Sequence, residues 1–216
     1  IPMKLAGLNS RYIKSLSNRT FLECIHDKYS FSDNVALLSK IINNKKYKGH
    51  VVLSYQDSIQ SMILWYRQLW GESLGKNRKG THLMPAIGSI DQHSQLQMWL
   101  DGPNNLFYTI IIPRKRKKDF KIKDNNKLIP KYLEKKTLGN ILYSMGIATY
   151  RELVKAKRPV RLILLDNDSI YPVVKLMSFF MLEVSILGKV IGINPFDQPA
   201  VEKVKVLTKK LLLKNG

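Results

Sequence analysis

The feature that most constrains this chain is an alternation of short, uninterrupted apolar runs with longer segments of helical periodicity. A fully buried strand forms a continuous apolar run, whereas an amphipathic helix repeats apolar residues every three or four positions. The runs "HVVLSY" (50–55), "LFYTIII" (106–112) and "PVRLILLD" (159–166) predict strands. Segments of helical spacing precede, separate or follow them, at 30–49, 56–73, 91–101, 138–157 and from Tyr171 onward.

This alternation predicts an α/β fold with a mostly parallel sheet and helices on both faces. No internal repeat or low-complexity linker divides the 216 residues, so we expect one domain, with a length that can bury a sizeable core. In such sheets ligands collect at the carboxyl ends of the strands, which is where the general rule places a site.

Cysteine and histidine usage limits the kinds of site. The single cysteine, Cys24, excludes a disulfide framework and a cysteine-based metal site. No histidine or carboxylate cluster has metal-ligand spacing, so we predict no metal. The start carries no signal-like segment, which favours the cytoplasm. The long apolar segment after Tyr171 is interrupted by Lys175, Glu183 and Lys189 and predicts a buried helix.

The net charge of +20 raises the local concentration of polyanions, phosphorylated metabolites and acidic surfaces alike. The densest basic run, "PRKRKKDFKIK" (113–123), has one aromatic residue and no accompanying nucleic-acid-binding pattern. We therefore interpret the lysines mainly as a solvated surface and regard nucleic acid as an unlikely partner.

Two side chains have a structural and a functional interpretation. Glu72, in "LWGESLGKNRKG", is either a solvated loop carboxylate or a partly desolvated base with a raised pKa, because Trp70 and Gly71 flank it. His93, in "IDQHSQ", is either a hydrogen-bonded structural residue or a proton-transfer group whose tautomer its polar neighbours fix.

The stretch "NPFDQPAVEKVK" (194–205) predicts the start of a last helix. Pro199 restricts Gln198 to extended geometry, so Gln198 suits the N-cap and Pro199 the first helical position. The helix is expected to bury an apolar stripe formed by Val201, Val204, Leu207, Leu211 and Leu212. Lys205 falls at the edge of this stripe, where it either snorkels or reaches toward an anionic oxygen.

Taken together, "WGESLGK" (70–76), "DQHSQLQMWLDGP" (91–103) and "GINPFDQPAVEKVK" (192–205) closely resemble glucose-6-phosphate isomerase, particularly its bacterial members. The third stretch is the most specific, since the family pattern there is N-P-F-D-Q-x-G-V-E-x-x-K and only Ala200 departs from it. The opening "IPMKLAGLNSRYIKSL" resembles the segment that follows the family's first sugar-isomerase domain. The resemblance covers essentially the whole chain, but only the C-terminal half of the family.

The resemblance implies a sugar-isomerase (SIS-type) domain, a flavodoxin-like three-layer sandwich spanning residues 1–216. It also implies aldose-ketose isomerisation between glucose 6-phosphate and fructose 6-phosphate through a cis-enediol(ate), with no metal or organic cofactor. By match to the family motifs, Glu72 is the base, His93 assists ring opening across a homodimer interface, Lys205 lies near the ring oxygen and Gln198 contacts the substrate.

Two family motifs are absent from the 216 residues: the phosphate-binding S-K-S-G-T-T-like loop and the arginine motif G-G-R-[FY]-[ST]. The N-terminal SIS domain is likewise outside this chain. We therefore expect little or no isomerase activity from the chain alone. The alternative is a non-catalytic SIS-type binding module that uses its basic surface on polyanions such as nucleic acid.

Overall fold

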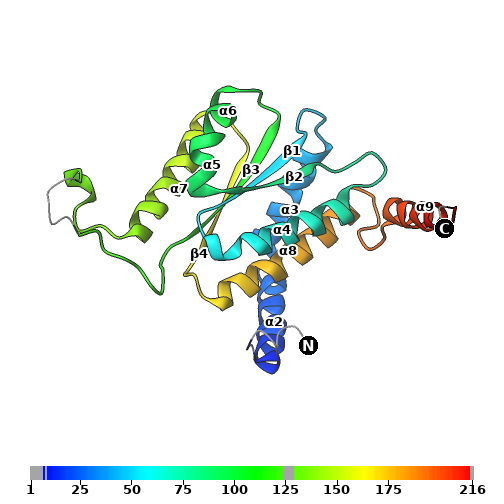
Figure 1. The fold of residues 1–216 in the computed structure, drawn as a ribbon, viewed down its shortest axis with the longest axis horizontal. Helices are drawn as coiled ribbons and strands as arrows, with labels where there is room; N and C mark the ends of the chain where they lie inside the picture. Colours follow the sequence, from blue (N-terminus) through cyan, green and yellow to red (C-terminus); the bar gives the residue numbers. More distant parts are fainter. Residues whose placement is uncertain (1–6, 8, 124–128, 215–216) are drawn as a thin grey trace.

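Four parallel strands form the centre of the computed structural model, which describes residues 7, 9–123 and 129–214 (Figure 1). The strands are β1 (Gly49–Ser54), β2 (His82–Ile87), β3 (Leu106–Pro113) and β4 (Val160–Leu165). Their order across the sheet is β2-β1-β3-β4. The parallel α/β prediction is confirmed, and the three strands assigned from apolar runs are β1, β3 and β4. β2 was not assigned, because its "HLMPAI" sequence is short and contains Pro85.

Helices cover both faces of the sheet, as the alternation predicts (Figure 1). One face carries α3 (Lys28–Asn43), α4 (Gln60–Leu74) and α8 (Ile170–Val190), with α2 (Ser10–His26) packed against α8. The other face carries α5 (Gly88–Ser94), α6 (Leu96–Asp101) and α7 (Leu138–Lys155). Short 3-10 turns η1 (Asp57–Ile59) and η2 (Lys131–Leu133) precede α4 and α7, and α9 (Pro199–Lys214) closes the chain.

Several predicted helix boundaries are wrong in detail. The helix predicted over 30–49 spans Lys28–Asn43 instead, and no side chain caps its start. The helix predicted over 91–101 is two short helices, α5 and α6, separated at Gln95. By contrast, α7 begins at the predicted residue, Leu138, because Thr137 and Asn140 form a reciprocal capping box.

A buried polar cluster lies between the sheet and α8. Glu183, fully buried, accepts hydrogen bonds from the Tyr66 hydroxyl at 2.5 Å, from Asn34 Nδ2 at 2.6 Å and from the Arg161 guanidinium. Burial alone would lower the pKa of Arg161, but the Glu183 carboxylate raises it above its usual value. Burial and the same carboxylate raise the pKa of the Tyr66 hydroxyl. The core of this face is therefore held by a closed ion pair as well as by apolar packing.

The α8 helix is long and apolar enough to cross a membrane by length and composition alone. Its buried side chains, which include Leu176, Phe180 and Leu187, pack in the core against α4 and the sheet. In this fold α8 is a core helix, as its interrupted sequence predicts.

Candidate active site

Glu72 lies in the last turn of α4, near the amino ends of the strands. The helix runs back antiparallel to β1, and the Trp70 indole Nε1 donates to the Thr81 carbonyl, one residue before β2, at 3.0 Å. The Glu72 carboxylate is half-buried and accepts a hydrogen bond from Gln68 Nε2 at 3.0 Å. Trp70 is fully buried in the core, so it packs away from the carboxylate.

The Glu72 side chain lines an open depression of about 750 Å³ between α4 and the start of α9. Its other lining residues are Ser61, Leu64, Trp65, Arg67, Gln68, Gly71 and Val201. This depression is the place where the α4 motif and the last-helix motif meet.

Lys76 ties these two motifs together. Its Nζ donates to the Asn194 carbonyl at 2.5 Å and pairs with Asp197 Oδ1 at 3.0 Å, and the lysine side chain is only 10% exposed. The hydrogen bond from Lys76 holds the pKa of Asp197 below its usual value. The loop after α4 is thereby fixed to the segment that leads into α9.

Two further contacts hold this segment. Lys79 Nζ donates to the Ile191 carbonyl at 2.6 Å. Gly188 lets α8 approach the segment closely, since a Cβ there would meet Pro195 Cβ at 2.9 Å. Sequence reasoning did not assign a role to Lys76 or Lys79, because their partners lie more than a hundred residues away along the chain.

Gln198 occupies the predicted place before α9. Its carbonyl accepts from Val201 N at 3.2 Å and from Glu202 N at 3.4 Å, and Pro199 is the first helical residue, as predicted. The Gln198 side chain is exposed. Lys205, also exposed, pairs with Glu202 Oε1 at 2.6 Å on the same helix. Within the described chain, Lys205 therefore contacts its own helix and does not reach Glu72.

The expectation that α9 buries an apolar stripe is wrong for this chain. Every described residue of α9 is exposed, and Figure 1 shows the helix extending away from the sheet. Val204, Leu207 and Leu212 are 65%, 56% and 71% exposed. Periodicity indicated which residues share a face, but that face is exposed, and of the five stripe residues only Val201 lines the α4 depression.

His93 lies at the carboxyl ends of the strands, opposite to Glu72. It is an exposed residue of α5, which starts directly after β2 ends at Ile87. A six-residue strand spans about 20 Å, so one chain does not bring His93 to the Glu72 depression. The general rule for parallel sheets indicates a site at the carboxyl ends of the strands. The candidate residues at Glu72 and Gln198, with the Lys76 contacts, lie instead toward the amino ends.

The neighbours of His93 do not fix its tautomer, contrary to expectation. Asp91 accepts from Ile87 N at 2.7 Å and from Ser94 Oγ at 3.0 Å, while Gln92 Oε1 accepts from the Tyr55 hydroxyl at 2.7 Å. No hydrogen bond to the His93 ring occurs within the described part of the chain. The ring is free to meet a group from outside this chain.

Among the described residues, no group of three or more histidine, cysteine or acidic side chains is placed to hold a metal ion.

No protein-family model matches the chain. Curated relatives do: it is 37% identical over 169 residues to glucose-6-phosphate isomerase of Thermus thermophilus, and 30% identical over 234 aligned positions to that of Carboxydothermus hydrogenoformans. The second match includes all of this chain. The chain is a homologue of part of glucose-6-phosphate isomerase. It spans 41% and 49% of the length of these two relatives.

Two solved structures share the fold of this chain. A hypothetical protein of Thermus thermophilus superposes with a TM-score of 0.88 and 31% identity, over 98% of this chain and 52% of that one. A glucose-6-phosphate isomerase of Chlamydia trachomatis superposes with a TM-score of 0.63 at 19% identity, over 77% and 35% of the two chains, which shows a shared fold. The chain thus shares its fold with 52% of the first structure and 35% of the second.

Proposed function

We propose that residues 1–216 form the C-terminal SIS-type domain of a glucose-6-phosphate isomerase and take part in interconverting glucose 6-phosphate and fructose 6-phosphate. The domain would act in glycolysis and gluconeogenesis in the cytoplasm. The observation that carries the proposal is the Lys76 contact. In this homologue of the isomerase, it joins the loop after Glu72 to the segment that contains Gln198. The substrate, the activity and the site residues are proposals, because the chain spans less than half of its relatives.

The proposed chemistry needs a base that moves one proton. With the sugar ring open, the Glu72 carboxylate removes the proton from C2 of the aldose, giving a cis-enediol(ate). The carboxylic acid returns that proton to C1 while the hydroxyl proton passes from O2 to O1, which leaves the C2 ketone and C1 hydroxyl of the ketose. The open depression beside Glu72 gives a substrate access to this carboxylate. No residue in this scheme requires a metal or organic cofactor.

The other three residues bind or open the sugar. Gln198 would contact the substrate, and Lys205 would stabilise negative charge on a sugar oxygen. Lys205 must turn from Glu202 to do so, and its exposure leaves that motion unobstructed. His93 would assist ring opening in the depression of a second subunit, because its own sheet separates it from Glu72. A homodimer is part of the proposal for that reason.

The test uses turnover in the completed enzyme. One assay uses the chain alone. A second assay uses the chain joined to the part of the Thermus thermophilus isomerase that it does not span. We expect little or no activity alone and measurable isomerisation after completion. Glu72→Gln in the completed enzyme should lower kcat about 1000-fold, a typical loss for a general base. Glu152→Gln, an exposed change on α7, serves as the control, and wild-type rates in Glu72→Gln would refute the assignment of the base.

A titration separates this function from a polyanion-binding module. Calorimetry of the completed enzyme with 6-phosphogluconate, at low and moderate salt, should show saturable binding. Salt-sensitive binding to nucleic acid with no heat from the sugar phosphate would favour the binding module instead.

A further inference from the structure

The two edges of the sheet differ in how they are protected. An edge strand presents unpaired N–H and C=O groups, and proteins commonly blunt it with proline, charge or a covering element. The β2 edge is blunted in this way. His82 N donates to the Lys48 carbonyl, just before β1. The backbone N–H and C=O groups therefore face β1 at His82, Met84 and Ala86. At the alternate residues, Leu83, Pro85 and Ile87, the backbone groups face outward.

Both later outward positions of β2 lack a free N–H group. Pro85 has no N–H, and the Ile87 N–H is capped by Asp91 Oδ2 at 2.7 Å. A further strand would find few donors along this edge.

The β4 edge has no such protection. Tyr108 N donates to the Pro159 carbonyl and Arg114 N to the Leu165 carbonyl, so the odd-numbered residues of β4 bond to β3. The N–H and C=O groups of Val160, Leu162 and Leu164 consequently point outward, and none has a partner in the described part of the chain. The sequence "VRLILL" has no proline, and its one charged side chain, Arg161, is bonded inward to Glu183.

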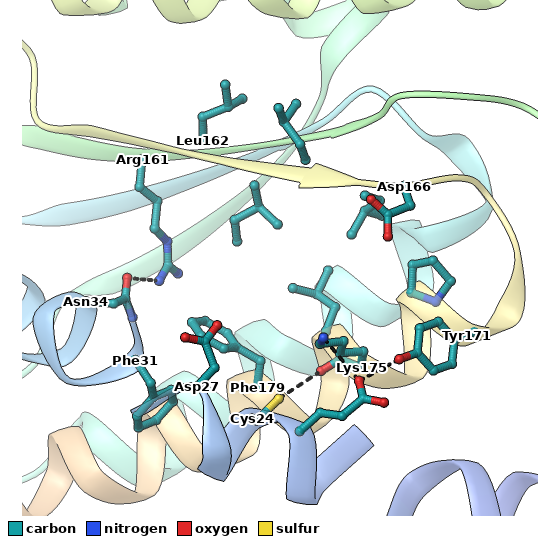
Figure 2. Close-up of a pocket in the computed structure, with 16 residues that line it drawn as sticks. Cys24, Asp27, Phe31, Asn34, Arg161, Leu162, Asp166, Tyr171, Lys175 and Phe179 are labelled. Carbon is teal, nitrogen blue, oxygen red and sulfur yellow. Dashed lines mark hydrogen bonds and ion pairs between the residues drawn. The ribbon is translucent and has the colours of Figure 1, made fainter. Parts of the chain in front are cut away.

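A groove runs beside this open edge. Figure 2 shows it with β4 above and the helices α2 and α8 below, with Arg161 pointing into it toward Asn34 and Leu162 on the other side of the strand. It encloses about 500 Å³ and is lined by residues 161–166 together with side chains of α2, α3 and α8. The first five residues of β4 are only partly buried, whereas β1 is buried throughout.

The groove has an apolar floor and acidic rims. Phe31, Leu176 and Phe179 supply apolar surface, and the carboxylates of Asp27 and Asp166 carry no ion pair among the described residues. An occupant that fits is an extended strand with apolar side chains toward the floor and basic side chains opposite Asp27 and Asp166. A second copy of this chain is the alternative occupant, and concentration-dependent dimerisation of the chain alone would reveal it.

We propose that the β4 edge is the docking site for an extended strand from the portion of glucose-6-phosphate isomerase that this chain does not span. The relatives are about twice as long as this chain, so they contain the polypeptide needed to cover the edge. The added strand forms main-chain hydrogen bonds with Val160, Leu162 and Leu164 and fills the groove. The inference rests on the homology and not on catalysis.

The test is amide hydrogen exchange, read residue by residue. The probe is the part of the Thermus thermophilus isomerase that this chain does not match, made as a separate polypeptide. In the chain alone, the Leu162 and Leu164 amides should exchange at least about 100-fold faster than those of Arg161 and Ile163, whose N–H groups bond to β3. On addition of the probe, the two outward amides should slow to the rate of the inward ones.

Paired variants isolate the hydrogen bonds. Leu162→Pro removes an outward N–H that has no partner in this chain, and should reduce binding of the probe at least tenfold. Leu162→Ala keeps the N–H and should bind within about threefold of wild type. The exchange measurement on the unaltered chain stands even if Leu162→Pro fails to fold.

Two results would overturn the proposal. One is a probe that leaves the exchange of Leu162 and Leu164 unchanged, whether or not it binds elsewhere. The other is protection of these amides in the chain alone with concentration-dependent dimerisation, which would make a second copy the occupant.

Discussion

At the scale of single residues, the most consequential arrangement is the buried ion pair between Arg161 and Glu183. Glu183, on α8, is fully buried, and the Arg161 side chain, which reaches it from β4, is 19% exposed. A closed pair of this kind adds little relative to an apolar replacement of both partners, but the loss of one partner leaves a buried charge without compensation.

Glu183→Leu should therefore lower the free energy of unfolding by about 3–5 kcal/mol, measured by urea denaturation. Glu152→Leu, at a position of α7 whose side chain is 55% exposed, is the matched control and should change it by less than about 0.5 kcal/mol. The double variant Arg161→Met with Glu183→Leu should recover part of the loss. A cost below about 1 kcal/mol for the single variant would contradict the assignment.

Glu23 makes a pH-dependent contribution to the stability of the folded chain. Hydrogen bonds from Tyr171 and Lys175, with a smaller one from Arg19, lower its pKa from 4.5 to about 2. Because the folded pKa is depressed, the stabilisation is fully present above the unfolded value and is lost as the pH falls through the folded value.

Between about pH 5 and pH 2 the chain should thus lose stability more steeply than a Glu23→Gln variant, as measured by thermal unfolding across that range. Tyr171→Phe removes the hydroxyl that donates to Glu23 Oε2 at 2.5 Å and should remove part of the same slope. Equal slopes in all three proteins would show that Glu23 is not the group responsible.

At the scale of elements, α9 is the unusual helix, because it is amphipathic yet exposed along its described length. An isolated helix of 16 residues is marginal in water, and packing normally supplies most of a helix's stability. α9 therefore contributes little to the stability of this chain, and its apolar stripe is exposed in the described part of the chain.

Deletion of residues 199–216 should leave the melting temperature within about 2 °C of the intact chain, since residues 199–213 are all exposed. Leu187→Ala, at a fully buried position of α8, is the comparison and should cost about 2–5 kcal/mol. If the deletion costs as much as Leu187→Ala, α9 packs on the domain in solution.

At the scale of the whole molecule, net charge matters more than any exposed pair. A charge of +20 on 216 residues makes self-repulsion a destabilising force that salt screens. The Arg161–Glu183 pair is buried, so added salt should change its contribution to stability little.

Raising NaCl from about 10 mM to about 300 mM should accordingly increase the free energy of unfolding, measured with urea as a non-ionic denaturant. Replacing Lys117, Lys118, Lys121 and Lys123 by glutamine reduces the net charge from +20 to +16 and should make the salt effect smaller. A decrease in stability with salt would contradict the dominance of repulsion.

The fold and the site were predictable to different extents. Apolar runs located β1 and β3 because central strands buried on both faces are apolar throughout, and located β4 because it is apolar apart from Arg161. β2 escaped notice because an edge strand tolerates Pro85 and half-exposed positions. The family motifs supplied Glu72, His93, Gln198 and Lys205 as candidates, and their roles remain predictions.

The sequence by itself determined the fold class, the Gln198–Pro199 helix start and the homology to glucose-6-phosphate isomerase, because these depend on local chemistry and short patterns. Only the tertiary structure decided that Lys76 joins the loop after Glu72 to the Gln198 segment, and that His93 lies at the far end of the strands. It also decided that, among the described residues, the outer edge of β4 is open and α9 is exposed. Those features depend on contacts between residues distant in the chain, and periodicity identifies an apolar face without specifying what covers it.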